Sequence, residues 1–301
     1  MVTLLIPTTY EVDPQLEPLE LRPSTLESMS YCPARQKYTD HPLYDGHPSE
    51  AMSFGSLLHA LIYPNFLPEQ QDTGVAIRYT PNEVLAAWGR VAEIDSFKLA
   101  DVTSSSTLRT LTLEARDLYD EWVREVWPVL RDYVTLAVEV RLRHPLGVLP
   151  SGRQVFLNGT PDRVRVGGLD DWKTGGSHYD QGKADSRPQG QYYAWLCERE
   201  YGMPFTDMTY WSAHRGKGAW IHVTQSITKR SQASAVAAAM EWAGMIESGF
   251  YPPTPSAPTG KNGRGWWCGP KYCAAWLACD FKGLIADDRD LDAPLERGWP
   301  A

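Results

Sequence analysis

A pair of glycines, Gly167-Gly168, separates two short segments in which apolar and polar residues alternate. Alternation with a period of two is the pattern of a half-buried strand, and residues 155–166 and 169–173 both follow it. Two glycines between such segments are typical of a tight turn, because glycine readily adopts the positive φ angles that a hairpin turn needs. The sequence therefore predicts an antiparallel β-hairpin centred on Gly167-Gly168.

The predicted hairpin gathers charged residues on one side. With a two-residue turn, Val164 would lie opposite Asp171, and Asp162 would lie opposite Lys173. Directly opposed residues share a face of a sheet, as do residues two apart on one strand. Asp162, Asp171 and Lys173 should therefore project to one face, and Asp170 to the other.

Two carboxylates and an ammonium group on one face suit hydrolysis of a phosphodiester. Carboxylate oxygens bind Mg²⁺ or Mn²⁺, and such an ion stabilises charge on a phosphate and activates a bound water molecule. The amine of Lys173 would orient that water or the phosphate and balance the developing charge. The simpler alternative is a surface ion pair between Asp171 and Lys173, since an Asp-x-Lys sequence taken alone is common.

Residues 159–162 (Gly-Thr-Pro-Asp) and 169–175 (Leu-Asp-Asp-Trp-Lys-Thr-Gly) resemble the RecB-like branch of the PD-(D/E)XK nucleases. In that branch one core strand carries a Gly-x-x-Asp motif and the next carries Asp-x-Lys-Thr-Gly. The resemblance implies that Asp162 and Asp171 bind Mg²⁺ or Mn²⁺ and that Lys173 is the catalytic lysine. It also implies an α/β fold with a restriction-endonuclease-like core, in which helices flank a mixed central sheet.

Three outlying matches extend the resemblance. The Gly-x-x-x-His pattern that ends at His59 resembles a helix of the family and implies that His59 completes the metal site. Gln189 and Tyr193 match the family's Gln-x-x-x-Tyr motif (Gln191 is the alternative glutamine), which implies contact with DNA phosphate or with the lysine. Glu139, on the strand before the acidic motif, is implied as a further ligand. The alternative for each is an ordinary packed or solvated residue.

The cysteines predict a second metal site. Cys268, Cys273 and Cys279 lie within twelve residues, and clustered cysteines in a reducing compartment indicate metal binding. Together with the distant Cys32-Pro, they resemble the iron–sulfur branch of the same family, which includes CRISPR-associated adaptation nucleases. The resemblance implies a 4Fe–4S cluster, although the first late spacing is longer than usual. A structural zinc ion is the alternative, and Cys197 is expected to be a buried thiol.

We expect three parts along the chain, an irregular N-terminal segment, one nuclease domain and a tail: residues 1–23, 24–280 and 281–301. The core of the domain would span residues 108–248, and its ends, at Cys32 and residues 268–279, would be joined by the cluster. No apolar run approaches the roughly 20 residues that cross a bilayer, and the N-terminus lacks a signal-peptide pattern. The sequence therefore predicts a cytoplasmic protein without a membrane partner.

The net charge of −8 argues against a broad basic surface that coats nucleic acid, but it allows a local basic groove. Arg215 and Lys217 in a predicted turn, and Lys229 and Arg230 at the start of a helix, are candidate DNA contacts. Their alternative is an ordinary solvated turn.

Together these features predict a metal-dependent DNA exonuclease acting on single strands or duplex ends, in recombination or DNA processing. The resemblance favours an exonuclease over an endonuclease and a phage-type protein, which would act in the host cytoplasm. A recombination protein or a second copy of the chain is a candidate partner. The second hypothesis is a non-cleaving DNA-binding or recombination scaffold with a nuclease fold. A third, an iron–sulfur redox protein, leaves the acidic hairpin unexplained.

Overall fold

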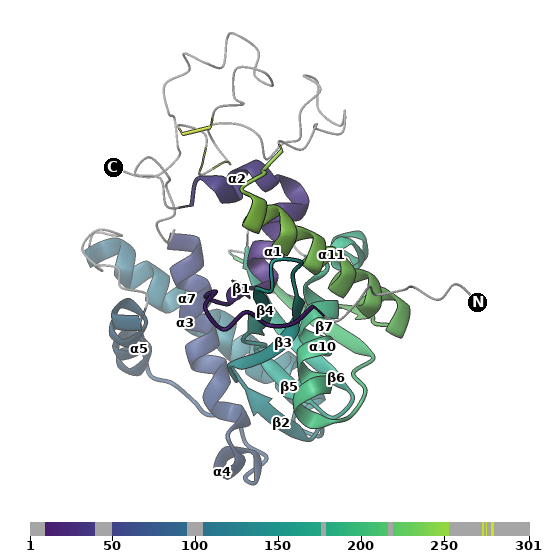
Figure 1. The fold of residues 1–301 in the computed structure, drawn as a ribbon. Coiled ribbons are helices and arrows are strands. Elements are labelled where there is room, and N and C mark those ends of the chain that lie inside the picture. The colour runs from purple at the N-terminus through teal and green to yellow at the C-terminus, as the bar shows by residue number, and fades with distance from the viewer. Residues whose placement is uncertain are drawn as a thin grey trace. The chain divides into compact units, whose positions relative to one another are not determined.

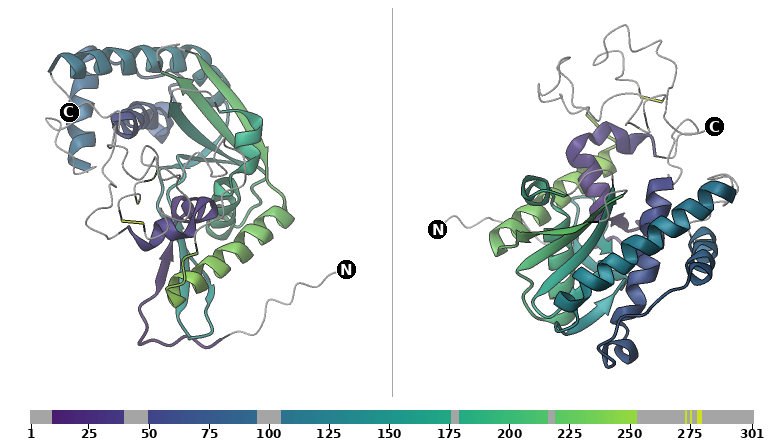
Figure 2. Two further views of the ribbon diagram at one scale, coloured as in Figure 1. Left: turned by 90° about the horizontal axis from the view of Figure 1, so that it is seen from above. Right: turned by 180° about the vertical axis from the view of Figure 1, so that it is seen from behind.

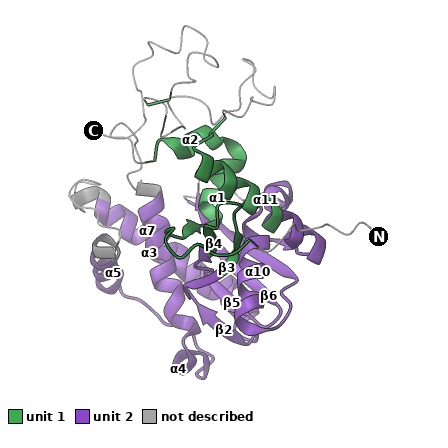
Figure 3. Cartoon of the chain, viewed as in Figure 1, with its two compact units in different colours: residues 1–47, 145–157, 236–301 green, residues 48–144, 158–235 purple. Residues whose placement is uncertain are grey.

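The computed structural model describes five stretches of the chain and four single residues near its end: residues 10–39, 50–94, 105–175, 179–215 and 219–252, with Cys273, Ala275, Ala278 and Cys279. The chain divides into two compact units, each built from separate segments (Figure 3). Unit 1 comprises Met1–His47, Pro145–Leu157 and Val236–Ala301. Unit 2 comprises Pro48–His144 and Asn158–Ala235. The expected tail at residues 281–301 lies outside the described residues, and the expected single domain stays a prediction.

A five-stranded mixed sheet forms the centre of unit 2 (Figure 1). Its strands, in spatial order, are β2 (Thr135–Val138), β5 (Arg163–Arg165), β6 (Gly168–Gly175), β7 (Asp207–His214) and β8 (Trp220–Ser226). The β6–β7 pair is parallel, and the other three pairs are antiparallel. The parallel pair is possible because a helical connection lies between these two strands in the chain.

The turn of the β5–β6 hairpin differs from the predicted one. Arg165 pairs with Gly168, so Val166 and Gly167 form the turn. The prediction that both glycines occupy the turn was wrong, because only Gly167 takes a positive φ angle, 78°, while Gly168 already belongs to β6.

The correct register moves every strand partner by two residues. Val164 pairs with Leu169 and not with Asp171, and Arg163 pairs with Asp170. A shift of two residues leaves each side chain on its predicted face, because the side-chain period of a strand is two. Asp170 and Asp171 therefore still project to opposite faces of the sheet, as predicted.

Helices cover both faces of this sheet (Figure 2). On one face, α3 (Glu50–Ile62) and α7 (Ser105–Glu125) pack against each other and against the strands, with α5 (Pro81–Ile94) beside them. On the other face, α10 (Gln189–Tyr201) contacts β6 and β7. The remaining short helices of this unit are η1 (Tyr63–Phe66), α4 (Pro68–Gln71), α8 (Trp127–Leu130) and α9 (Gln181–Ser186).

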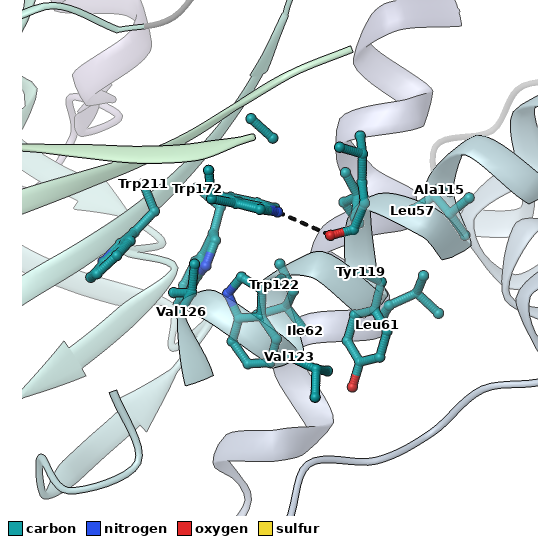
Figure 4. Packing of buried hydrophobic residues seen from close by; sticks show 14 of the residues in the cluster. Leu57, Leu61, Ile62, Ala115, Tyr119, Trp122, Val123, Val126, Trp172 and Trp211 are labelled. Atoms are coloured by element: carbon teal, nitrogen blue, oxygen red, sulfur yellow. Dashed lines mark hydrogen bonds between the residues drawn. The ribbon is translucent and has the colours of Figure 1, made fainter. Parts of the chain in front are cut away.

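An aromatic core fills the space between the sheet and α3 and α7 (Figure 4). Trp122 is fully buried and stacks on Tyr119, with the two ring centroids 5.7 Å apart. Phe66 contacts the rings of both Trp122 and Trp172. Burial of several such side chains contributes roughly 2–3 kcal/mol each to folding, so β6, which carries Trp172, is anchored firmly.

A three-stranded sheet has the order β1 (Leu19–Leu21), β4 (Gln154–Gly159) and β3 (Leu142–Val148). Unit 1 contains β1 and the larger part of each of the other two strands. β1 pairs in parallel with β4, so the segment expected to be irregular contains a strand. The helices α1 (Pro23–Tyr31), α2 (Pro33–Lys37) and most of α11 (Lys229–Ser248) also belong to unit 1.

The strand expected over residues 155–166 is divided into β4 and β5. The break contains Pro161, which has no N–H to donate to a strand partner. The predicted α/β fold, with mixed sheets flanked by helices, is confirmed. None of the helices that the structure describes combines the length and apolarity needed to cross a bilayer.

Candidate functional site

Asp162, Asp171 and Lys173 come together at the β5–β6 hairpin. Nζ of Lys173 lies 2.6 Å from Oδ2 of Asp171, and Asp171 is only 1% exposed. Oδ2 of Asp162 accepts a hydrogen bond of 2.8 Å from the backbone N–H of Trp172, the residue between the other two. The acidic cluster, by which we mean Asp162, Asp171 and Lys173, is thus held by both strands of the hairpin.

His59 reaches the acidic cluster from α3. Its Nδ1 lies 3.7 Å from Oδ1 of Asp162 and 3.7 Å from Oε1 of Glu139. Its Nε2 lies 3.1 Å from the backbone carbonyl oxygen of Trp172. Because a carbonyl oxygen only accepts, Nε2 carries a proton, and Nδ1 is the nitrogen that faces the carboxylates.

Gly55 explains how the helix comes so close to the strand. A Cβ atom at this position would lie 3.2 Å from Oγ1 of Thr174 on β6, a tight contact. Without that atom α3 approaches β6, and His59 follows one helical turn later on the same face. The Gly-x-x-x-His spacing thus has a structural reason in this fold.

Glu139 has an unusual backbone conformation. Its φ angle is +44°, in the left-handed region that a residue with a side chain seldom adopts. Its N–H donates a hydrogen bond of 3.0 Å to the backbone carbonyl of Asp162. Such strain persists where the surrounding structure imposes it, and it concentrates at functional sites. Here the conformation accompanies a carboxylate that points at His59.

Charge interactions shift the pKa values of the site. Burial by itself lowers the pKa of His59, but the charge of Asp162 and two further carboxylates raises it to about 9. Burial raises the pKa of Asp162 to about 6, although His59 opposes the shift. Burial lowers the pKa of Lys173, but Asp171 and Asp162 outweigh it, so the net pKa is raised. Both cationic side chains therefore respond to a strongly negative site.

The residues around His59 fit a small hard cation. A cleft of about 10 Å³ lies among His59, Glu139 and Asp162, which is room for one ion or water molecule. Carboxylates with one imidazole suit Mg²⁺ or Mn²⁺. Within the described ranges, no three His, Cys, Asp or Glu side chains are already arranged to hold an ion. A bound cation would compete with Lys173 for Asp171.

Gln189 and Tyr193 lie one turn apart on α10, as predicted from the motif. Nε2 of Gln189 is 3.5 Å from the hydroxyl of Tyr193. Oε1 of Gln189 is buried and accepts no hydrogen bond from any residue that the structure describes. A buried amide oxygen without a donor is costly. This amide is therefore available to a ligand or water, and its role stays a prediction.

A buried ion pair behind the acidic cluster was missed in the sequence. Arg163 is fully buried and donates to Oδ2 of Asp170 at 2.9 Å, while Asp170 also accepts from Nε1 of Trp211 at 3.0 Å. Arg163 and Asp170 directly adjoin Asp162 and Asp171 in the chain. The pair therefore fixes the two strands from the face opposite the carboxylates.

Three of the four predicted cluster ligands are described, all in unit 1. Cys273 interacts electrostatically with Cys32 and Cys279, and both raise its pKa, after burial as the largest cause. Cys268 lies outside the described residues. Cys197 is fully buried, and burial raises the pKa of its thiol to about 12. The cluster stays a prediction.

The predicted DNA-contacting cations that the structure describes do not join the acidic cluster. Arg215 forms an ion pair of 3.1 Å with Glu114, and Lys229 forms one with Glu198. Arg230 is exposed at the start of α11. Lys217 lies outside the described residues.

The comparisons with known proteins concern the fold. No family model matches the chain, and no curated protein matches it. The crystal structure of a "Putative exonuclease" from Eubacterium rectale covers 78% of this chain and 83% of its own, with 12% identity and a TM-score of 0.50. The crystal structure of SSO0001 covers 89% and 88%, with 14% identity and a TM-score of 0.39. At such identities the first likeness shows a shared fold and not a shared activity.

Proposed function

We propose that this protein is a metal-dependent deoxyribonuclease that hydrolyses phosphodiester bonds of DNA. The observation that carries the proposal is the convergence of Asp162, Asp171, Lys173, His59 and Glu139 on one small region of the hairpin. A structural scaffold has no need for a buried carboxylate beside a partly buried lysine and a second carboxylate, since burying charges is costly. The exonuclease name of the Eubacterium rectale neighbour supports the same reading.

The metal would be Mg²⁺ or Mn²⁺, held by Asp162, Asp171, Glu139 and His59. When bound, such an ion supplies charge stabilisation for the phosphate and a water molecule of lowered pKa. His59 must release the proton from Nδ1 before that nitrogen can bind a cation. The hydrogen bond from Nε2 to the Trp172 carbonyl would keep the ring oriented while Nδ1 binds the cation.

Lys173 would act as a cation. Its pKa is raised, so the amine stays protonated at neutral pH and is a poor proton acceptor. An ammonium group in this place holds the scissile phosphate and balances charge that develops on its oxygens. Gln189 and Tyr193 would contact the same phosphate or keep Lys173 in position.

We further propose an exonuclease that acts on single strands or duplex ends in recombination or DNA processing. Cys32, Cys268, Cys273 and Cys279 would bind a 4Fe–4S cluster with a structural role, and zinc is the alternative. Thiolate ligands of this kind require a reducing compartment, which favours the cytoplasm. A phage-type origin and a recombination partner rest on the resemblance alone.

The test is incubation of end-labelled single-stranded and duplex DNA with the protein and Mn²⁺, with EDTA and an Asp162→Asn variant as controls. Cleavage by the wild type only, with stepwise shortening from an end, is the expected result. Early internal fragments would indicate an endonuclease. Tight binding without any cleavage would favour the non-cleaving scaffold.

A further inference from the structure

A second group of side chains lies one strand away from the acidic cluster, on the same face of the sheet. In the parallel β6–β7 pair, Tyr210 lies beside Asp171, and Ser212 lies beside Lys173. Neighbouring strands are about 5 Å apart, and paired residues project to one face. Tyr210 and Ser212 therefore lie on the strand next to the proposed site of hydrolysis.

Tyr179 packs over Tyr210 and Ser212. Its ring stacks on that of Tyr210, with centroids 4.8 Å apart and an angle of 25° between the planes. Its backbone N–H donates a hydrogen bond of 3.0 Å to Oγ of Ser212. The residue is 5% exposed. Two independent contacts thus fix the position of the ring.

Two cations lie over the Tyr179 ring. Nζ of Lys183, on α9, is 5.4 Å from the ring centroid, and the guanidinium carbon of Arg187, just after α9, is 5.2 Å from it. Both side chains are partly exposed. A cation–π contact holds a cation in place without cancelling its charge. Arg187 is also close enough to Lys173 for its charge to act on that ammonium group.

Two carboxylates of this helical segment accept hydrogen bonds from residues close in the chain. Oδ1 of Asp180 accepts a hydrogen bond of 2.7 Å from the backbone N–H of Lys183, which caps α9. Oδ1 of Asp185 accepts one of 2.9 Å from the amide of Gln181. Arg187 therefore places a second positive charge near that of Lys173.

We propose that Lys183 and Arg187, held on the Tyr179 ring, bind the DNA phosphate that neighbours the one at the acidic cluster. The two cations would position single-stranded DNA over β7 and so fix the direction in which it enters the site. Arg187 suits this role because its planar guanidinium group can bond two phosphate oxygens at once. This inference rests on the proposed nuclease function, because that function makes DNA the ligand.

The experiment measures binding of a fluorescent single-stranded oligonucleotide over a range of salt concentrations, without added divalent metal so that no cleavage occurs. Each phosphate contact contributes about 0.7 to the slope of log K against log salt for single strands. Because the two cations bind one phosphate, the double variant Lys183→Ala/Arg187→Ala should reduce the slope by about 0.7, and each single variant by a smaller amount. Arg187→Lys keeps the charge and should retain most of the slope.

Arg199→Ala is the matched control. The guanidinium carbon of Arg199 lies 5.0 Å from the ring centroid of Trp195, so the variant removes the same charge and the same kind of contact. Arg199 is near the opposite end of α10 from Gln189, about 15 Å along the helix axis at 1.5 Å per residue. Its slope should equal that of the wild type, and thermal melts should show that every variant folds.

Cleavage assays separate this inference from the proposed function. With Mn²⁺, the double variant should raise KM for the oligonucleotide several-fold and leave kcat unchanged, and it should not affect hydrolysis of bis-p-nitrophenyl phosphate, which lacks a neighbouring phosphate. An unchanged slope in the double variant, or no measurable binding by the wild type, would overturn the inference. Loss of the nuclease proposal alone would appear as wild-type binding with normal slopes and no hydrolysis of either substrate.

Discussion

The backbone N–H of Trp172 donates a hydrogen bond to the side chain of Asp162 across the β5–β6 hairpin. The Trp172 ring packs in the aromatic core, with its centroid 5.7 Å from that of Phe66. This packing holds the backbone of Trp172, and hence its N–H, in place. The donor also lies between Asp171 and Lys173 in the chain. One backbone bond therefore sets the spacing of both carboxylates, and Oδ1 of Asp162 remains directed at His59.

Replacement of Lys173 by alanine should abolish most of the cleavage without unfolding the protein. Loss of one group that stabilises developing charge typically lowers kcat by about 10²–10³. The measurement is Mn²⁺-dependent cleavage of end-labelled DNA, with circular dichroism as the folding check. Arg124→Ala, which removes an exposed cation of α7 paired with Glu121, is the control and should retain full activity. Full activity of Lys173→Ala would refute the assigned role.

A methyl group at Gly55 should weaken metal binding more than it weakens the fold. Gly55→Ala pushes α3 away from Thr174 and carries His59 with it. Displacement of a ligand support typically costs 10- to 100-fold in metal affinity, so a loss of about tenfold is expected by Mn²⁺ titration calorimetry.

Gly89→Ala is the matched helical control for that substitution. Gly89 lies exposed in α5, and no atom lies within 4 Å of an added Cβ. Alanine should therefore stabilise this helix by about 0.5–1 kcal/mol, measured by urea unfolding, and leave Mn²⁺ affinity unchanged. Equal effects of the two substitutions on Mn²⁺ binding would mean that the close approach of α3 does not position His59.

The left-handed backbone of Glu139 predicts that substitutions there affect stability and metal binding separately. Glu139→Gly removes the carboxylate and relieves the strain, whereas Glu139→Ala removes the carboxylate and keeps it. The glycine variant should be more stable than the alanine variant by about 1 kcal/mol in urea unfolding. Both should lose Mn²⁺ affinity to the same degree. Wild-type affinity in either variant would exclude Glu139 as a ligand.

The faces of the hairpin could be predicted from the sequence, and its register could not. The placement of Asp162 and Asp171 on one side depends only on the alternation of strand side chains, which a shift of two residues preserves. The turn itself depends on which glycine takes a positive φ angle, and both glycines of the pair are able to do so.

Features that depend on distant strands left no pattern in the chain. The left-handed conformation of Glu139 arises where β2 ends against Asp162, and no local residue type indicates it. Arg187 approaches Lys173 only because β7 runs parallel to β6 and carries Tyr210 into register with Asp171. Such contacts follow from strand order, which a single sequence does not reveal.

The proton on Nδ1 of His59 predicts how the metal-free protein responds to pH. The folded-state pKa of about 9 exceeds the ordinary value of 6.5, so His59 stabilises the fold fully below pH 6.5 and loses that effect as pH rises through about 9. The free energy of unfolding should therefore fall between pH 6.5 and 9, and His59→Gln should remove this dependence. Histidine resonances in an NMR titration measure the pKa directly, and a value near 6.5 would contradict the electrostatic picture.

The affinity for Mn²⁺ should depend on pH in the opposite direction from stability, because the ion competes with the Nδ1 proton of His59. Binding releases the Nδ1 proton, so affinity should increase as pH rises from 6.5 toward 9. Calorimetry in buffers of different ionisation enthalpy counts the released protons. Binding without proton release would show that His59 does not contact the ion.

The cysteines predict a coloured protein whose colour depends on Cys32, Cys273 and Cys279 and not on Cys197. Protein purified without air should be brown, with broad absorbance near about 400 nm, as iron–sulfur thiolate sites are. Cys32→Ser or Cys273→Ser should bleach it, since Cys32 lies close enough to Cys273 to raise its pKa. Cys197→Ala should keep the colour, because that thiol is fully buried and its pKa of about 12 disfavours a thiolate ligand. A colourless protein that contains one equivalent of zinc would replace the cluster by a tetrathiolate zinc site, while metal-free protein of full stability would remove the site altogether.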